Sequence, residues 1–200
     1  MAIVNGYCTL AEVKQALRLT DTVDDVLIEN AIEGASRRID GYCGRFFYKT
    51  ASTSLTMFPY SEYLIRFPND LANTTVTIKT DTNGDGTYAT TLVQGTNYVL
   101  EPTTSPLLGR PYTQARALHA ATFPVYFSPA PASIQVTGYW GWESVPHDVR
   151  EACVLLSMRQ FARLNAALGV VGFADMAITV RAIDPDVKDL LAPYRIVAVA

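Results

Sequence analysis

The sequence predicts an α+β protein in which a helical bundle, formed by the N- and C-terminal segments, carries a large inserted antiparallel β region. Near both ends of the chain apolar residues recur every three or four positions, as in amphipathic helices. Between about Thr53 and Trp142 they alternate instead, and prolines and turn residues separate them. We therefore expect a helical core from residues 1–50 and 143–200 and a β-rich insertion over residues 51–142.

Composition limits the class of protein. The chain has 200 residues and is 49% hydrophobic, which is enough for a substantial core. Only 18% of the residues are charged and the net charge is −3, so the chain lacks the basic excess of a general nucleic-acid binder. The opening MAIVNGYCTL has no basic segment before an apolar run, and no apolar stretch of about eighteen residues occurs. We expect a soluble protein made in a cytoplasm, without membrane contact.

The three cysteines, Cys8, Cys43 and Cys153, are odd in number and far apart. Each lies in or beside a helical pattern, where a small buried thiol is common. Because disulfides are rare in cytoplasmic proteins, we expect inert core thiols.

The first helix is expected to begin at Thr9. Thr9 and Glu12 have the spacing of a capping box, in which a hydroxyl and a carboxylate satisfy the first backbone N–H groups. The apolar residues that follow share one helical face: Leu10, Val13 and Leu17.

The second helix is expected to start near Thr22, with Asp24 and Asp25 in its first turn, and to end at Gly41 and Gly44. Its apolar positions recur at helical spacing: Ile28, Ile32, Ala35, Ile39 and Tyr42.

Arg37 and Arg38, near the end of this helix, allow two interpretations. An arginine pair can contact phosphate, but Glu33 and Asp40 lie close by in the sequence. Their presence favours a solvated helix end.

Short strands are expected within the insertion. The stretch from Lys79 to Tyr88 contains Gly84, Gly86 and several turn-prone residues between strand-like runs, which predicts a hairpin. Alternating apolar residues mark the strands: Leu55 and Met57, Tyr63 and Ile65, Val76 and Ile78, Tyr98–Leu100, and Ile134–Tyr139.

The same hairpin contains a weak candidate metal site. Asp81, Asn83 and Asp85 before Gly86 match the first half of a calcium-binding loop. The match stops there, because Leu92 occupies the position where a bidentate glutamate is needed. A polar turn is the alternative interpretation.

A long proline-rich loop is expected over about residues 102–132. Its apolar residues favour burial against another surface, or packing back on the β region itself. The candidate contact residues are Leu107, Leu108, Tyr112, Phe123, Tyr126 and Phe127.

Helical patterning resumes after Pro146 and runs from His147 to about Ala167, with apolar residues on more than one face. Such a helix is either central to its own fold or shared with a neighbouring subunit. The last helix is expected to have Asp184 as its cap and Pro185 at its first position, and to stop at Pro193.

The C-terminal segment is apolar and partly β-branched. It could pair with a strand edge or fill a groove on a partner, or it could fold against the protein's own helices. The candidate partner or intersubunit contacts are Tyr194, Arg195, Ile196, Val197 and Val199.

Signals for an enzyme are weak. His119 and His147 are the two histidines, and neither has a metal-ligand spacing to another histidine or a cysteine. Nucleotide-binding, hydrolase and zinc-protease motifs are absent from the sequence. We therefore assign no catalytic residue, no metal and no cofactor.

Several segments carry a resemblance to a known family through their order and spacing. They are Tyr7–Lys14, Ile32–Tyr48, Val145–Ala152, Asp184–Val187 and Leu190–Arg195. They lie in the two terminal regions, which together make up about half of the chain, and they resemble the head–tail connector (adaptor, or head-completion) proteins of tailed bacteriophages. The β insertion is the part that matches least well.

The resemblance implies a structural virion protein at the capsid–tail junction. It implies a homo-oligomeric ring of twelve subunits that binds the portal protein, passes double-stranded DNA without sequence-specific binding, and presents a platform to the next neck, stopper or tail protein. The C-terminal segment would dock on the portal or a neighbour. A calcium- or ligand-binding β module on a helical stalk stays open as the alternative function.

Overall fold

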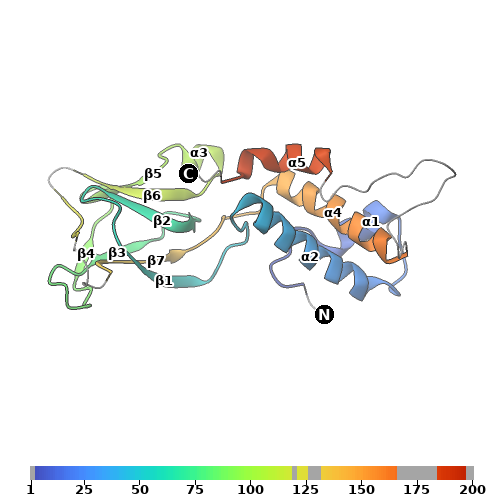
Figure 1. Cartoon of the computed structure of the whole chain (residues 1–200), viewed down its shortest axis with the longest axis horizontal. Helices are drawn as coiled ribbons and strands as arrows, with labels where there is room; N and C mark the ends of the chain where they lie inside the picture. Colours follow the sequence, from blue (N-terminus) through green and yellow to red (C-terminus); the bar gives the residue numbers. More distant parts are fainter. Residues whose placement is uncertain (1–2, 119–120, 126–131, 166–183, 197–200) are drawn as a thin grey trace. The chain divides into compact units, whose positions relative to one another are not determined.

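The computed structural model describes residues 3–118, 121–125, 132–165 and 184–196. The chain divides into two compact units, and each is described by itself (Figure 1). The helical unit consists of Met1–Tyr48 and Val145–Ala200, and the β unit consists of Lys49–Ser144. Helices together with antiparallel sheets confirm the predicted α+β class. Among the described helices, none has both the length and the apolar character needed to span a bilayer.

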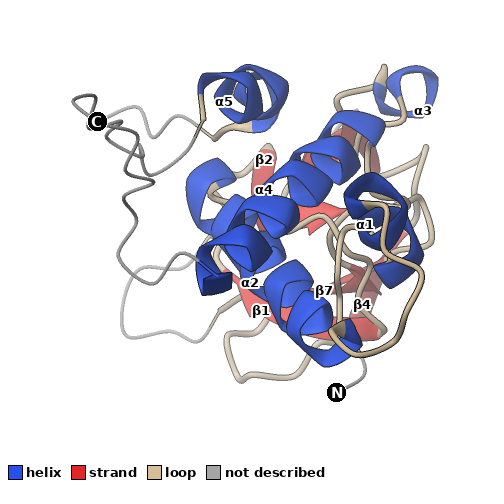
Figure 2. Ribbon diagram, turned by 90° about the vertical axis from the view of Figure 1, so that its right-hand side faces the viewer, coloured by secondary structure: helices blue, strands red, loops and turns tan. Residues whose placement is uncertain are grey.

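The helical unit is organised around two long helices that pack on each other, α2 (Asp25–Cys43) and α4 (His147–Asn165). The shorter helices α1 (Leu10–Leu17) and α5 (Pro185–Leu191) pack against α4, as Figure 2 shows, and a 3-10 turn, η1 (Ala192–Tyr194), follows α5. The buried face of α2 has helical spacing: Ile28, Ala31, Ile32, Ala35, Ile39 and Cys43.

The start of α1 confirms the predicted capping box. The Thr9 hydroxyl accepts the backbone N–H of Glu12 at 3.2 Å, and the Glu12 carboxylate accepts the backbone N–H of Thr9 at 2.7 Å. Two backbone donors that the first helical turn leaves free are thereby satisfied.

The predicted start of α2 near Thr22 is wrong, because the helix begins at Asp25. The carboxylate of Asp21 accepts the backbone N–H of Val23 at 3.2 Å, and such a local bond holds the chain in a turn instead of a helix. The predicted end is confirmed. Gly44 has a φ of 69°, a left-handed conformation that glycine adopts without steric cost, and its N–H donates to the carbonyl of Asp40 at 2.8 Å.

The last helix begins with Pro185 as predicted, but Asp184 makes no capping hydrogen bond. Its carboxylate pairs with the Arg159 guanidinium of α4 instead. The α-helix ends at Leu191, and Pro193 lies inside the 3-10 turn. A proline is compatible with that position because the first residues of a helical turn need no N–H partner.

The β unit contains two antiparallel sheets. One has the order β1 (Ser52–Met57), β7 (Ile134–Tyr139), β3 (Thr77–Thr80), β4 (Thr90–Leu92), and the other has the order β2 (Leu64–Leu71), β6 (Tyr112–Ala117), β5 (Tyr98–Glu101). Strands β3 and β4 form the predicted hairpin.

Leu71 links the two sheets of the β unit. It pairs with Tyr112 of β6 in one sheet and forms a bridge to Trp140, directly after β7 of the other. Leu71 is fully buried, and a Cβ atom at Gly138 would lie 2.8 Å from its Cδ1 atom. The close approach of the sheets at this point therefore requires a glycine.

The prediction of one long loop over about residues 102–132 is wrong in part. A short helix, α3 (Ser105–Leu108), and the strand β6 lie within it, and β6 is the central strand of its sheet. The sequence YTQARA of β6 has few large apolar residues, so its pattern is weak. Residues 112–117 adopt a strand because they form hydrogen bonds with β2 on one side and β5 on the other.

Candidate functional site

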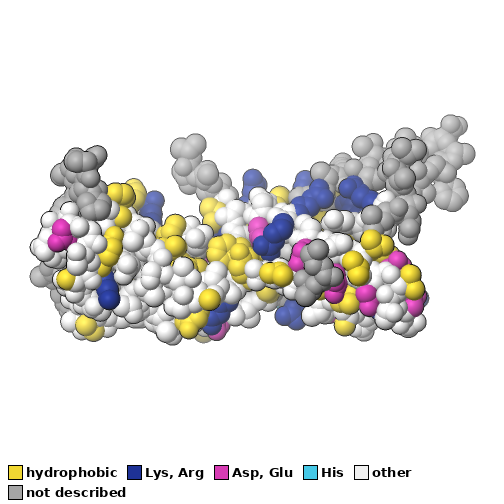
Figure 3. Space-filling view, turned by 90° about the horizontal axis from the view of Figure 1, so that it is seen from below, with side chains coloured by type: hydrophobic (Ala, Val, Ile, Leu, Met, Phe, Trp, Pro, Cys, Tyr) yellow, Lys and Arg dark blue, Asp and Glu magenta, His cyan; other side chains and the backbone are white. Residues whose placement is uncertain are grey.

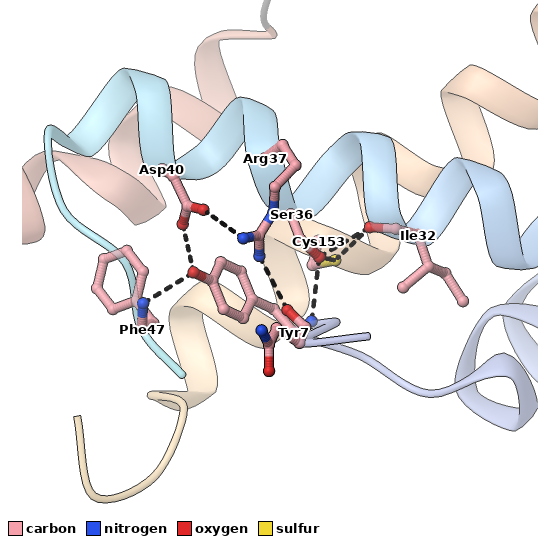
Figure 4. Close-up of polar contacts among 8 residues, drawn as sticks. Tyr7, Ile32, Ser36, Arg37, Asp40, Phe47 and Cys153 are labelled. Atoms are coloured by element: carbon pink, nitrogen blue, oxygen red, sulfur yellow. Dashed lines mark hydrogen bonds and ion pairs between the residues drawn. The ribbon is translucent and has the colours of Figure 1, made fainter. Parts of the chain in front are cut away.

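The N-terminal segment of the helical unit is fixed to α2 by a polar cluster, which we call the Tyr7 cluster: Tyr7, Ser36, Arg37, Asp40 and Phe47. Figure 4 shows the Tyr7 hydroxyl between the Asp40 carboxylate, to which it donates, and the Phe47 backbone N–H, which donates to it at 2.8 Å. The Tyr7 N–H donates to the Ser36 hydroxyl at 3.1 Å, and Arg37 pairs with Asp40 at 3.1 Å. The cluster joins three stretches of chain that are distant in sequence.

Burial governs the ionisation of this cluster. Burial, reinforced by the hydrogen bond to Asp40, raises the pKa of the Tyr7 hydroxyl, so Tyr7 stays neutral. Burial also raises the pKa of Asp40, against the opposing effects of the Tyr7 hydrogen bond and the Arg37 charge. A neutral hydroxyl that donates to a carboxylate is suited to a structural role, in which it holds two parts of the fold together.

Aromatic rings extend the Tyr7 cluster to the C-terminal segment. Phe47 makes an edge-on contact with Tyr7 at 5.6 Å between centroids and another with Tyr194 at 5.7 Å. The Tyr194 hydroxyl donates to the Asp148 carboxylate at 3.0 Å. The Ile196 N–H donates to the carbonyl at the end of α2, on Cys43, at 2.8 Å.

These contacts correct part of the C-terminal prediction. Tyr194 packs on the protein's own helices and anchors the segment there, while its side chain stays half-buried. Arg195 lies over the ring of Tyr42, yet both Arg195 and Ile196 are exposed, and Ile196 keeps 49% of its surface in contact with solvent. Val197 and Val199 lie outside the described residues.

All three cysteines are free and buried. The sulfur atoms of Cys8 and Cys153 lie 3.3 Å apart, and Cys153 also contacts the Ser36 hydroxyl at 3.4 Å. Burial raises the pKa of Cys43 to about 11, which keeps it in the unreactive thiol form.

The candidate contact residues of the predicted loop separate into two groups. Leu107 and Leu108, on α3, are 86% and 59% exposed. Tyr112 and Phe123 are buried within the β unit, so the prediction that they meet another surface is wrong. The Phe123 N–H donates to the carbonyl of Glu62 at 2.8 Å, which holds this stretch against its own unit. Tyr126 and Phe127 lie outside the described residues.

The calcium-like loop is organised by one buried carboxylate. One oxygen of Asp81 accepts the backbone N–H groups of Asn83 and Gly84, and the other accepts that of Gly86. Burial alone would raise the pKa of Asp81, but these hydrogen bonds outweigh it and hold the pKa below its usual range. The carboxylate thus stabilises the turn. In the described part of the chain, no group of three His, Cys, Asp or Glu side chains is placed to hold a metal.

Two exposed apolar surfaces were not predicted from the sequence. The turn between β1 and β2 presents aromatic side chains, and the start of α2 presents aliphatic ones. Their members are Phe58, Tyr60 and Tyr63 in the turn, and Val23, Val26 and Leu27 at α2. The available signal was large apolar residues placed next to polar ones in a turn and at a helix start, where no core can cover them. Clustered exposed apolar groups of this kind mark protein–protein contact sites.

Comparison with known proteins finds one family that part of the chain resembles. Residues 7–83 match the model of the phage gp6-like head-tail connector protein family. The matched range contains the Tyr7 cluster, α1, α2 and the first three strands. A search of curated proteins finds no match.

Three solved structures share the fold of the complete chain, each covering 100% of it. The neck of an empty GTA particle, computed with C6 symmetry, matches with 19% identity, 95% coverage of that chain and a TM-score of 0.56. The neck of a native GTA particle, computed with C12 symmetry, matches with 18% identity, 94% coverage and a TM-score of 0.58. The virion of a native gene transfer agent particle matches with 21% identity, 95% coverage and a TM-score of 0.57. Over residues 7–83 this chain is therefore similar to the phage head–tail connector family, and over its whole length it shares the fold of these solved structures.

Proposed function

We propose that the protein is a structural component of a phage-like virion and joins the head to the tail. It is made in the host cytoplasm and assembles as a ring below the portal, where it continues the DNA channel and offers a platform to the next neck, stopper or tail protein. The match of residues 7–83 to the head-tail connector family carries this proposal. The C12 symmetry of a neck structure with the same fold supports a ring of twelve copies.

In this proposal the two units have separate roles. The helical unit forms the wall of the ring, and the β unit faces the tail side or an adjacent subunit. Exposed apolar groups support both assignments: Val26 and Leu27 on α2, and Leu107 and Leu108 on α3. Repeated head-to-tail contacts between identical copies cover such groups when the ring closes.

The C-terminal segment is the proposed contact with the portal. Tyr194 holds the segment on the helical unit, while Arg195 and Ile196 stay exposed beyond it. Val197 and Val199 continue the same apolar sequence. A β-branched segment of this kind is suited to a groove or a strand edge on a partner.

The mechanism is assembly, without a chemical step. A net charge of −3 suits a channel through which double-stranded DNA must pass, because tight binding of the phosphate backbone would slow its passage. DNA is therefore a passing cargo that is not read by sequence, and no cofactor takes part.

Truncation of the C-terminal segment tests the proposal, and the last residue hydrogen-bonded to the helical unit sets the point of truncation. Removing residues 197–200 keeps the hydrogen bond from Ile196 to Cys43, so the chain should fold with unchanged thermal stability. Added to DNA-filled, portal-bearing heads that lack this protein, the truncated chain should fail to attach, whereas the full chain should attach and restore tail joining.

Two outcomes would contradict parts of the proposal. Attachment of the truncated chain at the full-length level would exclude the C-terminal segment as the portal contact. Failure of the full chain to bind such heads at all would exclude the connector function.

A further inference from the structure

A basic hollow of about 300 Å³ opens on the helical unit between α2 and α4. Three arginine side chains border it, and Leu156 forms part of its apolar lining. The complete set of lining residues is Gly34, Arg38, Leu156, Arg159, Gln160 and Arg163. We call this set the arginine hollow.

Like charges gathered around one hollow repel each other, so the site favours an anion that neutralises them. One lining arginine already binds a carboxylate from outside the lining: Arg159, whose side chain is only 18% exposed, pairs with Asp184. Arg163 is exposed and makes no ion pair within the described part of the chain. The hollow therefore recognises carboxylates and has capacity for another.

A matching acidic surface lies at the start of α2. Asp24 precedes the helix without a capping hydrogen bond, and Asp21 lies just before it. The third acid, Asp25, already pairs with Lys14 of α1, so Asp21 and Asp24 are the carboxylates offered to a neighbour. The neighbouring Val23 is 85% exposed and Val26 is 55% exposed. In the half of Figure 3 that holds the helices, Lys and Arg groups gather along the upper edge and Asp and Glu groups at the lower right.

We propose that the arginine hollow of one copy receives the acidic start of α2, residues 21–27, of the adjacent copy. The contact is head-to-tail, with carboxylates on guanidinium groups at its rim and the valines covered beneath them. This inference rests on the proposed ring and assigns the residues that close it.

A second copy fits the hollow better than the DNA backbone. The net charge of −3 opposes the approach of a polyanion, and Arg159 at the border of the hollow already pairs with a carboxylate. DNA would also leave the exposed valines at the start of α2 uncovered, whereas a neighbouring subunit covers them in the same contact.

Charge reversal with rescue tests the contact. Arg163→Glu alone and Asp24→Lys alone should each raise the protein concentration needed for half-assembly at least about tenfold. An equimolar mixture of the two variants should assemble at close to the wild-type concentration, because alternating copies restore an opposite-charge pair at every interface. The double variant should recover for the same reason.

Assembly is measured by light-scattering mass, for the protein alone and for the protein bound to portal-bearing heads. Lys188→Glu and Asp189→Lys, exposed on α5 outside the hollow, are the matched controls and should assemble like the wild type. Thermal unfolding of every variant checks that the fold is kept.

Each other outcome is decisive. Single variants that assemble normally, single variants that the mixture does not rescue, or a wild type that stops at a symmetric dimer would overturn the head-to-tail contact and leave the connector function standing. Loss of duplex DNA binding by Arg163→Glu with normal assembly would assign the hollow to phosphate instead. A wild type that assembles neither alone nor on heads would refute the connector function itself.

Discussion

The hydroxyl group of Tyr7 donates a hydrogen bond to the Asp40 carboxylate and accepts one from the Phe47 N–H, and so joins the N-terminal segment to the last turn of α2 and to the loop that follows it. Tyr7→Phe removes both bonds and leaves the buried partners with fewer contacts, so it should lower the free energy of unfolding by about 1–3 kcal/mol. Far-ultraviolet circular dichroism during denaturant unfolding follows the helical unit and measures the loss.

Tyr60→Phe is the control for that substitution. Tyr60 is 65% exposed, and its contact with the Arg66 guanidinium uses the ring face, which phenylalanine retains. Its free energy of unfolding should stay within about 0.5 kcal/mol of the wild type. Equal losses in both variants would show that the Tyr7 hydroxyl has no special role.

Asp81 makes stability depend on pH. Its folded pKa is lower than its unfolded pKa, so its contribution is complete above the unfolded value, which is about 3.9, and is lost as the pH falls through the folded value. Asp81→Asn should therefore destabilise the β unit at neutral pH, and the difference from the wild type should shrink steadily below about pH 4.

The same pair of proteins tests the calcium alternative. Because both oxygens of Asp81 accept backbone N–H groups, added calcium should leave the melting temperature of either protein unchanged. A calcium-dependent rise in the wild type that Asp81→Asn abolishes would establish a metal-binding loop.

Two glycines should respond to alanine in opposite directions. In Gly138→Ala the new methyl group would lie 2.8 Å from the Leu71 side chain in the core of the β unit, and overpacking of this kind costs about 1–3 kcal/mol. Gly41 lies in α2 with open space around it, so Gly41→Ala should stabilise the helical unit by about 0.4–1 kcal/mol.

The two units can be followed separately in that experiment. Trp140 and Trp142, the two tryptophans of the chain, both lie in the β unit, so their fluorescence reports on Gly138→Ala and circular dichroism reports on Gly41→Ala. A stabilised Gly138→Ala protein would mean that the sheets separate freely at Leu71.

The exposed face of α3 should matter for assembly and not for folding. Leu107→Ser with Leu108→Ser should change the free energy of unfolding by less than about 0.5 kcal/mol for each residue, because neither side chain is buried. If α3 meets an adjacent subunit or a tail-side partner, the attachment of the double variant to portal-bearing heads, or the tail joining that follows, should fall. Unchanged attachment and tail joining would remove α3 from the contact surfaces.

Local signals in the sequence were sufficient to predict most helices of the helical unit and where they end. The hydroxyl and carboxylate of Thr9 and Glu12 act within one helical turn, and Gly44 ends α2 through its own backbone conformation. Such features depend on neighbours in the chain, so a sequence reveals them. The start of α2 was misjudged because Asp21 forms a turn of its own.

Features that depend on distant partners were not predicted. Strand β6 is defined by its pairing with β2 and β5, and the residues YTQARA give little indication of it. The arginine hollow combines Arg38 of α2 with residues of α4 more than one hundred positions away. From the sequence alone, Arg37 and Arg38 allowed either a phosphate contact or a solvated helix end, and the second was favoured. Likewise, nothing near Tyr194 in the sequence indicates that Phe47 lies against its ring.

The pairing of β1 with β7 has a consequence for how this protein can change. Ser52 lies opposite Tyr139, and the Thr50 N–H donates to the carbonyl of Trp140 at 2.9 Å, so the inserted segment leaves and returns through adjoining strands. An insertion tethered at one spot can grow, shrink or be exchanged for a foreign module without reshaping its host. The surface presented by the β unit can therefore change while the core of the helical unit stays the same.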